Sequence, residues 1–350
     1  MTAHTGVTTV THFIHKNFLP LLLATYMFAA LMPAVGLAMR HVSFGDVTLP
    51  RLGQTHMSLS LVMLSFLLFN AGLGIKTKEL LDLRKKPRLL LVGFLANMLI
   101  PIFISFCLRG AMTYWHSSDE VQNLMVGLAF IIAMPIAGSS AAWAQNANGN
   151  LSLSLGLILL STVLSPVTTP LVLHLFSFMT QGDYAEDLHE IAQQGTNAFL
   201  CLTVVFPSLA GMAFHYIAGE ERTAKIKPFL KLANFIVLLL LNYSNASTSL
   251  PQVVAHPDWD LLILILATTT LICSVAFYAG WLVSWAFKTD QSDKAALMFS
   301  LGMNNNGTGL VLAATALADH PAVMLPMIFY TLVQQVIAAI IDLKIFKAEE

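Results

Sequence analysis

The stretch Ala295-Ala-Leu-Met-Phe-Ser-Leu-Gly-Met-Asn-Asn-Asn-Gly-Thr-Gly-Leu310, which continues apolar to Leu317, decides the fold. Neither apolar arm crosses a bilayer alone, because nine helical residues rise roughly 14 Å and eight roughly 12 Å against a hydrocarbon core about 30 Å thick. Together the arms make one span only if the polar residues from Asn304 to Thr308 lie near the midplane. Backbone of that kind at that depth lines a cavity or is buried in protein. We therefore predict an interrupted transmembrane helix over residues 294–317.

Such an interruption is suited to binding ions. The second arm would begin with free N–H groups and a partial positive charge, which favour an anion, and the carbonyls that end the first arm favour a cation. The alternative is that Asn304, Asn305 and Asn306 only make hydrogen bonds between helices. Three consecutive side chains point in three directions around a helix, so this alternative explains them poorly.

The rest of the chain repeats the apolar run. Of the 350 residues, 56% are hydrophobic and 11% charged, whereas a soluble domain carries about 25% charged residues. This composition excludes an ordinary soluble fold and predicts an all-α membrane protein of about ten spans. The predicted spans are 18–39, 57–75, 88–108, 121–146, 150–177, 196–218, 230–250, 260–287, 294–317 and 321–343.

Basic residues predict the orientation, because cytoplasmic loops hold Lys and Arg in excess. With a cytoplasmic N-terminus, 15 of the 18 Lys and Arg residues fall inside, and the outer loops hold Arg40, Arg51 and Arg109. We expect a multi-pass protein of the inner or plasma membrane with cytoplasmic ends at 1–17 and 344–350. The inside group includes Lys16, Lys76, Lys78, Arg84, Lys85, Lys86, Arg88, Arg222, Lys225, Lys227 and Lys231.

An acidic, polar stretch divides the predicted spans into five and five. It covers residues 178–195 and is expected to be an extracytoplasmic loop between a first repeat, 18–177, and a second, 196–343. Two homologous halves with an odd number of spans insert in opposite senses, as in inverted-repeat transporters. In each half the fourth span is the least regular, which points to a binding site between the halves.

The fourth span carries the sequence Met134-Pro-Ile-Ala-Gly-Ser-Ser140. Pro135 removes a backbone donor and Gly138 relaxes the chain, so an interruption is plausible here. Spacing alone leaves open that 121–137 is a short complete span followed by a loop. Span five carries a stripe of hydroxyls, and span three a lone amide, Asn97; both fit either helix packing or a ligand site. The stripe comprises Ser154, Ser161, Ser165 and Thr168.

Motifs for catalysis are missing from the sequence. It holds no HExxH zinc motif, no phosphate-binding loop and no nucleophile elbow, and no carboxylate lies well inside a predicted span; Asp260 and Asp342 lie near span ends. We therefore expect no enzyme, no catalytic residues and no metal-binding motif.

Four stretches resemble the bile acid:sodium symporter family. They are Phe69-Asn-Ala-Gly-Leu-Gly-Ile-Lys76, Met134-Pro135 through Ser165-Pro166, Val205-Phe-Pro207 through Gly219-Glu220, and Gly302-Met-Asn-Asn-Asn-Gly307. The resemblance implies ten helices in two inverted repeats, with a panel of spans one, two, six and seven beside a core of the other six. It also implies that spans four and nine break and cross in the core, with substrate near Ser139, Ser140, Asn305, Gly307 and Thr308.

The resemblance also implies two sodium sites, and this sequence departs from the first. Its positions are Ser140, Ala141, Ser154, Ile158 and Ser300, so that Ser300 stands where the family has a Glu. The second site maps onto Asn97 (or Ala96 without a one-residue shift), Leu301, Met303 and Asn304. Without the Glu a buried cation lacks a fixed counter-charge, which is costly. Either the anionic substrate supplies that charge or sodium does not bind.

The sequence thus predicts a secondary transporter of a small or amphipathic organic anion, bile-acid-like or a carboxylate, that works by alternating access with sodium as coupling ion. The nearest alternative is a sodium-independent carrier, uncoupled or proton-driven, on the same scaffold. A channel would need a continuous polar path, and a non-transporting receptor would tolerate loss of the Asn cluster. We expect the organic anion and the lipid bilayer as partners, no nucleic acid, and no cofactor except Na⁺. The oligomeric state stays open.

Overall fold

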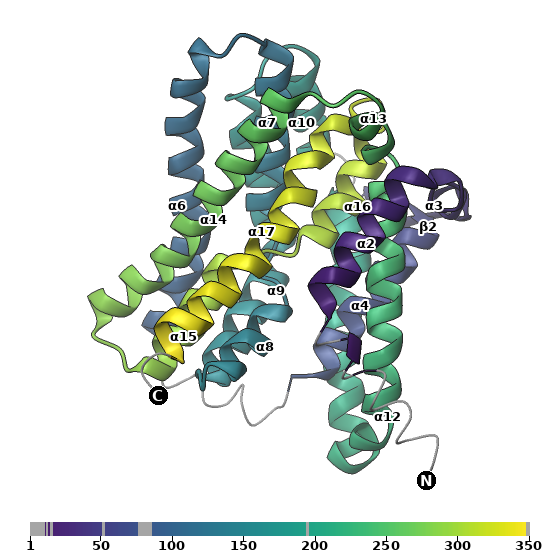
Figure 1. The fold of residues 1–350 in the computed structure, drawn as a ribbon. Coiled ribbons are helices and arrows are strands. Elements are labelled where there is room, and N and C mark those ends of the chain that lie inside the picture. The colour runs from purple at the N-terminus through teal and green to yellow at the C-terminus, as the bar shows by residue number, and fades with distance from the viewer. Residues whose placement is uncertain are drawn as a thin grey trace. The chain divides into compact units, whose positions relative to one another are not determined.

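The computed structural model of the chain describes residues 11, 13–14, 17–50, 53–75, 86–193 and 196–347. Within them, five helical segments are long and apolar enough to cross a membrane, and six if the bent pair Phe18–Leu31 and Pro33–His41 counts as one span. The remaining predicted spans correspond to shorter or interrupted helices. The chain is therefore a multi-pass α-helical membrane protein (Figure 1). The five are Pro87–Tyr114, Leu151–Ser177, Thr196–Ala246, Trp259–Phe287 and Pro321–Phe346.

The chain forms two compact units, each built from two separate segments of sequence. The first unit comprises 1–77 and 198–257, and the second comprises 78–197 and 258–350. Much of the basic sequence used to orient the chain, Lys16, Arg51 and 76–85, lies outside the described residues, as do most of 1–17 and the final 348–350.

The first predicted span is bent rather than straight. Helix α2 (Phe18–Leu31) and helix α3 (Pro33–His41) meet at an angle of 87°. Met32 between them has φ −133° and ψ 64°, and Pro33 begins α3. The residue before a proline is disfavoured in the helical region, so Pro33 explains a bend that the apolar run alone does not reveal.

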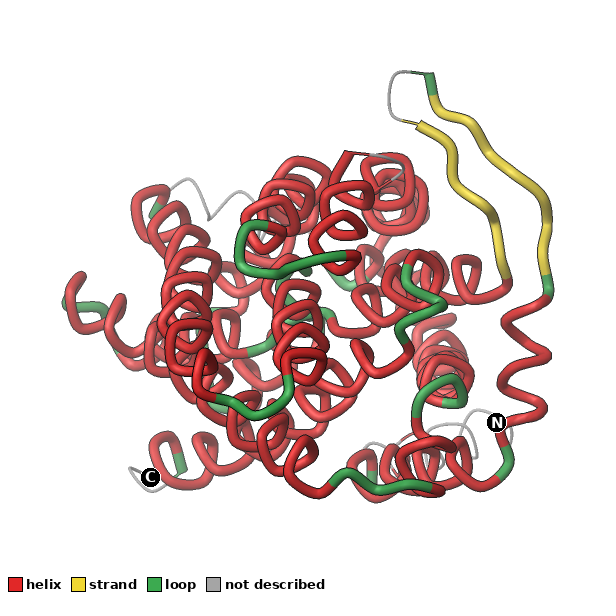
Figure 2. Tube along the Cα trace, turned by 90° about the horizontal axis from the view of Figure 1, so that it is seen from above, coloured by secondary structure: helices red, strands yellow, loops and turns green. Residues whose placement is uncertain are grey.

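A β-hairpin follows α3, where we expected only a loop. Strand β1 (Ser43–Leu49) pairs antiparallel with β2 (Gly53–Ser58), as Figure 2 shows in yellow. Across the strands, His56 Nε2 lies 2.7 Å from Ser43 Oγ and its Nδ1 lies 2.6 Å from Asp46 Oδ1. These exposed polar pairs stabilise the hairpin by cross-strand contacts.

Two long helical segments of the first unit pack with almost no space between their backbones. A Cβ added to Gly72 in α4 (Leu59–Leu73) would lie 1.9 Å from the Ser208 carbonyl oxygen, and one added to Gly211 would lie 2.0 Å from the Phe69 oxygen. Small residues allow this approach, as in other membrane helix pairs. Helix α11 (Thr196–Leu200) spans the boundary at 197/198, and the first unit also contains a π-helical turn (Cys201–Val205) and α13 (Leu250–Ala255).

Helix α12 (Phe206–Ala246) replaces the loop expected between spans six and seven. Its helical geometry is interrupted only at Gly219, with φ 80° and ψ 164°. Glycine adopts this conformation readily, and helix resumes directly after it. The predicted loop 219–229, with its basic residues, is therefore helical apart from Gly219.

The second unit contains the two interrupted helices. Three unbroken helices, α6 (Pro87–Ala111), α9 (Leu151–Ser177) and α14 (Trp259–Phe287), pack with them (Figure 1). The interrupted pairs are α7 (Ser118–Ala133) with α8 (Ser139–Asn146), and α15 (Gln291–Gly302) with α16 (Asn306–Ala316). The unit is completed by the 3-10 turns Met112–Tyr114 and Pro321–Met324, by α17 (Leu325–Ile341) and by a π-helical turn Asp342–Phe346.

The acidic stretch expected as the loop 178–195 contains helix α10 (Asp183–Gln193). Leu188 and Ile191 are buried on one side of α10, which packs on α9. Its other side carries the acidic residues that marked the stretch as a loop. Because apolar residues recur at helical spacing, the segment is an amphipathic surface helix.

Candidate functional site

The two helix interruptions of the second unit pair with each other. Residue Ile136, between α7 and α8, forms an antiparallel bridge with Asn304, between α15 and α16. The Ala137 N–H donates to the Met303 carbonyl at 2.9 Å, and the Asn305 N–H donates to the Pro135 carbonyl at 2.9 Å. Unpaired backbone groups are costly where lipid excludes water, so each interruption satisfies the other. We call this pairing of 134–138 with 303–305 the crossing.

Side chains from neighbouring helices make hydrogen bonds to backbone groups near the crossing that are not paired within it. On α9, Thr169 Oγ1 donates to the Ala133 carbonyl at 2.7 Å, and Ser161 Oγ accepts from the Ile136 N–H at 3.0 Å. On α14, Cys273 Sγ lies 3.7 Å from the Gly302 carbonyl. The helix ends at the crossing are therefore held by the unbroken helices beside them.

Asn304 is the hydrogen-bonding centre of the crossing and is only 3% exposed. Its side-chain Nδ2 donates to the Ile131 carbonyl at 3.0 Å, and its backbone N–H donates to Gln334 Oε1 at 3.1 Å. Asn97 Nδ2 on α6 approaches two oxygens, the Leu301 carbonyl at 3.1 Å and Asn304 Oδ1 at 3.4 Å. Residues from α6, α15 and the crossing thus bring several oxygens together around one amide group.

Ser300, at the position where the resemblance implies a Glu, contacts a second serine of the same predicted site. Ser154 Oγ on α9 and Ser300 Oγ on α15 are 2.9 Å apart, and both residues are fully buried. This pair of hydroxyls is neutral. Ser140 is also fully buried, and its hydroxyl finds no hydrogen-bond partner among the residues that the structure describes.

Two helices begin at the crossing, α8 at Ser139 and α16 at Asn306. Asn305 Oδ1 caps α16 by accepting from the Thr308 N–H at 3.3 Å. The Thr308 hydroxyl and both polar atoms of the Asn306 carboxamide are buried without a partner in the described part of the chain. Ser139 is exposed and Gly307 half-buried. The two N-termini therefore combine partial positive charge with polar groups that lack partners.

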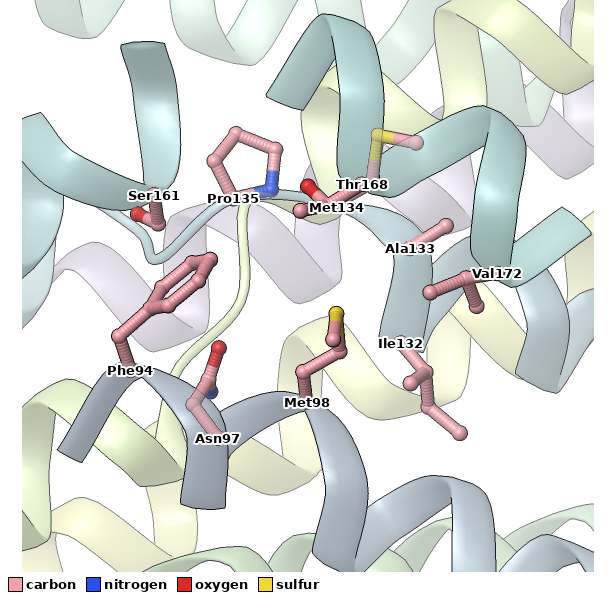
Figure 3. A pocket seen from close by; sticks show the side chains of 10 residues that line it. All are labelled: Phe94, Asn97, Met98, Ile132, Ala133, Met134, Pro135, Ser161, Thr168 and Val172. Atoms are coloured by element: carbon pink, nitrogen blue, oxygen red, sulfur yellow. The ribbon is translucent and has the colours of Figure 1, made fainter. Parts of the chain in front are cut away.

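A small cavity lies beside the crossing, between α6, α7 and α9 (Figure 3). Its free space is about 10 Å³, about what one water molecule needs. The carboxamide oxygen of Asn97 points into it, and Ser161 and Thr168 contribute hydroxyls to its wall. The side of Asn97 opposite its two hydrogen bonds therefore faces space in which a small polar species fits.

Two carboxylates of the second unit are buried, and neither belongs to the crossing. Asp342, after the end of α17, is 2% exposed and pairs with Lys347 Nζ at 2.8 Å. Asp293, in the first turn of α15, is 3% exposed, forms an ion pair with Lys86 and accepts from Asn150 Nδ2 at 2.8 Å. It lies about nine residues from Gly302, or roughly 14 Å along the helix. The charge of Asp293 is thus neutralised by Lys86. Through Lys86 and Asn150 the carboxylate connects the first turn of α15 to the residues that precede α6 and α9.

The structure brings most of the residues singled out in the sequence into one region. Asn97, Leu301 and Asn304 are in contact, Ser154 meets Ser300, and Met303 and Asn305 take part in the crossing. Sequence reasoning missed Gln334 and Thr169, and it named Asn306 only as part of the interruption, without a role in the site. Gln334 carries the same signal as Asn97, an amide in an apolar span, but Gln335 beside it hides which of the two faces inward.

Comparisons with known proteins identify the family of this chain. The model of the Sodium Bile acid symporter family matches residues 61–256. An uncharacterized protein YbaS of Bacillus subtilis (strain 168) is 30% identical over 281 residues, 79% of this chain and 85% of its own length. An uncharacterized sodium-dependent transporter YocS of the same bacterium is 24% identical over 265 residues, 75% of each chain. A probable sodium/metabolite cotransporter, BASS2 of Oryza sativa subsp. japonica, a chloroplastic protein, is 24% identical over 254 residues, 72% of this chain and 55% of its own.

Proposed function

Because the chain belongs to the sodium bile acid symporter family, we propose that it moves a small or amphipathic organic anion across the membrane, with sodium as the coupling ion. Family members are secondary transporters, not enzymes, and act on small molecules from within the membrane. The observation that carries the proposal is the crossing, which joins two helix N-termini to a cluster of oxygens in one buried region.

The anionic group of the substrate binds at the starts of α8 and α16. Helix N-termini favour negative charge, and the unpartnered hydroxyls of Ser140 and Thr308 are donors that such a group can use. Ser139 and Gly307 are the accessible positions of the same two N-termini, and Asn305, the last residue of the crossing, caps α16. This set gives the substrate site Ser139, Ser140, Asn305, Gly307 and Thr308.

Sodium binds between Asn97 and Asn304. At present the NH₂ group of Asn97 donates to the Leu301 carbonyl and to Asn304 Oδ1. Turning this carboxamide would replace the donor by an oxygen and leave three oxygens facing one another. Oxygen ligands of this kind suit hard cations, and the Met303 carbonyl is one residue away from Asn304. Ser300, where the resemblance implies a Glu, is neutral and pairs with Ser154. It therefore supplies no fixed negative charge to compensate the ion.

The transported anion then supplies the missing charge. A cation in a low-dielectric site is costly unless it is paired, and the nearest candidate for pairing is the anion at the N-termini of α8 and α16. Each ligand should therefore raise the affinity for the other, by the same factor in both directions. This is symport by charge compensation between substrate and ion, without a carboxylate of the protein.

The test is the melting temperature of the purified protein in detergent, measured with sodium or choline chloride, each with and without taurocholate or pantoate. A ligand that binds only the folded state raises the melting temperature by mass action. We expect the largest shift with sodium and an anion together, exceeding the sum of the separate shifts. A shift with the anion that is the same in choline would contradict sodium coupling and favour the sodium-independent carrier.

The proposed architecture has two inverted five-helix repeats, 18–177 and 196–343, and cytoplasmic termini. An interrupted helix in each half and two compact units support it, as they support a core that moves against a panel during alternating access. Single cysteines placed in a variant without Cys107, Cys201 and Cys273 test the orientation. An impermeant maleimide added to intact cells should label position 114 but not 227; the reverse result would contradict it.

A further inference from the structure

Three metal-ligating side chains meet at one end of the second unit, away from the crossing. His116 lies in the connection between α6 and α7, Glu120 in the first turn of α7, and Asp260 in the first turn of α14. One ligand atom of each lies within 4.8 Å of the other two. We infer that His116, Glu120 and Asp260 form a binding site for a divalent transition metal, zinc above all.

The distances fit a zinc site with little movement. His116 Nε2 is 3.1 Å from Asp260 Oδ2 and 3.6 Å from Glu120 Oε1. Zinc binds nitrogen and carboxylate oxygen at about 2.0–2.2 Å in a tetrahedral arrangement, which places neighbouring ligand atoms roughly 3.3–3.6 Å apart. The ligand atoms of Glu120 and Asp260 lie within 4.8 Å of each other, so rotation of these side chains would bring all three atoms around one ion.

Glu120 is already held in the orientation of a ligand. Its Oε2 accepts from the Trp115 indole N–H at 2.7 Å, which leaves Oε1 directed at His116. Ligating carboxylates in metal sites are typically fixed by such an outer hydrogen bond. The side chain of Glu120 is 14% exposed, whereas those of His116 and Asp260 are 60% and 55% exposed. A fourth coordination position is thus open to water.

The charges at the site call for a cation. Glu120 and Asp260 both have His116 as their ion-pair partner, and within the described ranges no Lys or Arg nitrogen lies within 4 Å of either carboxylate. One imidazole carries at most a single positive charge, so two carboxylates are not neutralised. A dication removes that excess. The imidazole ligand favours zinc over magnesium and calcium, which prefer oxygen ligands alone.

A bound ion would connect the start of α7 to the start of α14. Helix α7 leads directly to the crossing at Ala133, and α14 holds the Gly302 carbonyl through Cys273. In the proposed orientation this end faces the outside, where the ion can enter from the medium. Zinc therefore acts as a clamp on two helices that support the crossing.

The test uses the untagged, chelator-treated full-length protein in detergent. Zinc affinity is measured by competition with a chromophoric chelator, and cobalt(II) is added separately to record its visible absorption. We expect one zinc per chain, a tetrahedral cobalt spectrum and a higher melting temperature with zinc. His116→Ala should lower the zinc affinity at least tenfold, and Trp115→Phe, which frees Glu120, about tenfold.

The matched control is His189→Ala, because His189 is an exposed histidine whose Nδ1 lies 3.1 Å from that of His174, a second pair able to attract zinc. This control should leave the affinity and the cobalt spectrum unchanged. Zinc affinity that survives His116→Ala, or that falls only in His189→Ala, would overturn the inference. So would octahedral cobalt absorption in the wild-type protein.

Discussion

Replacing Asn304 by alanine tests the crossing and the sodium site at once. The change deletes two side-chain hydrogen bonds, from Asn304 Nδ2 to the Ile131 carbonyl and from Asn97 Nδ2 to Asn304 Oδ1. The backbone N–H of residue 304 keeps its bond to Gln334. Hydrogen bonds between membrane helices contribute about 0.6 kcal/mol on average and about 1.7 kcal/mol at most. Asn304→Ala should therefore cost about 1–3 kcal/mol, or about 2–6 °C in melting temperature at about 2 °C per kcal/mol.

The same variant should lose the response to sodium. At a sodium concentration ten times the dissociation constant, binding stabilises the wild type by about 1.4 kcal/mol, which corresponds to about 3 °C. The variant has lost one of the three oxygens, so this shift should disappear. Melting temperatures of the purified protein in sodium or choline chloride, followed by tryptophan fluorescence, measure both effects.

Asn234→Ala is the matched control, since Asn234 Oδ1 accepts from Asn70 Nδ2 at 3.4 Å in the first unit. It removes an amide contact of similar length and should keep the full sodium shift. If Asn304→Ala also kept that shift, Asn304 would not be a sodium ligand. If its melting temperature in choline equalled that of the wild type, the two hydrogen bonds would not stabilise the crossing, and the structural reasoning would be refuted.

Three further predictions follow from particular contacts. Gly307→Ala should fold normally, because an added Cβ meets only Asn305 Oδ1, at 3.6 Å, yet it should reduce substrate-induced stabilisation by taurocholate or pantoate; an unchanged response would exclude Gly307 from the substrate site. Gly302→Ala should lower the melting temperature by several degrees, because its Cβ would lie 2.4 Å from the Phe277 ring and overpacking costs about 1–3 kcal/mol; wild-type stability would show that α14 yields easily. Burial raises the pKa of the Asp187 carboxyl in α10, with neighbouring carboxylates adding to the effect and His320 opposing it, so the folded state binds this proton more tightly and is destabilised as pH rises. Asp187→Asn should therefore melt higher than wild type at pH 7.5, the gap closing below about pH 4; a gap that widens on acidification would contradict this sign.

The interruption within 294–317 could be predicted from the residues themselves, whereas for the fourth span spacing left a short complete helix as an alternative. Asn304 to Gly307 have no acceptable place in lipid except a broken helix, and the structure begins α16 at Asn306. Proline alone is a weaker signal. Pro166 and Pro170 lie inside the continuous α9, where Ser165 Oγ donates at 2.8 Å to the Thr162 carbonyl that Pro166 leaves without its helical donor. At Pro166 a neighbouring hydroxyl thus replaces the missing backbone donor, and a proline by itself does not predict a broken helix.

The structure of the polar connections was harder to predict. Low hydropathy shows that a segment lies outside the lipid, but it does not show whether that segment is a helix or a loop. The basic residues after Gly219 mark an aqueous segment but are also good helix formers, so the loop expected there is helical apart from the glycine itself. Similarly, α10 is polar overall, and only the spacing of Leu188 and Ile191 reveals a buried side. The bend before Pro33 lies within an apolar run. The length of that run predicts a span but gives no sign of a bend.

The site residues could be named from the sequence, but not their partners, because a partner depends on the rotation of each helix about its axis. That limit matters most at Ser300. The family resemblance implies two sodium sites, of which the first has a Glu at this position, and the structure treats their remaining ligands differently. The hydroxyls of Ser154 and Ser300 bond to each other and need no ion. The oxygens of Leu301 and Asn304 are held by a single amide whose rotation exchanges a donor for a third oxygen. Replacement of the Glu would therefore close the first site and leave the second able to bind sodium only when an anion compensates its charge. A carrier of this kind would depend on its substrate for ion binding more strongly than one with a fixed carboxylate, because the missing charge enters with the cargo.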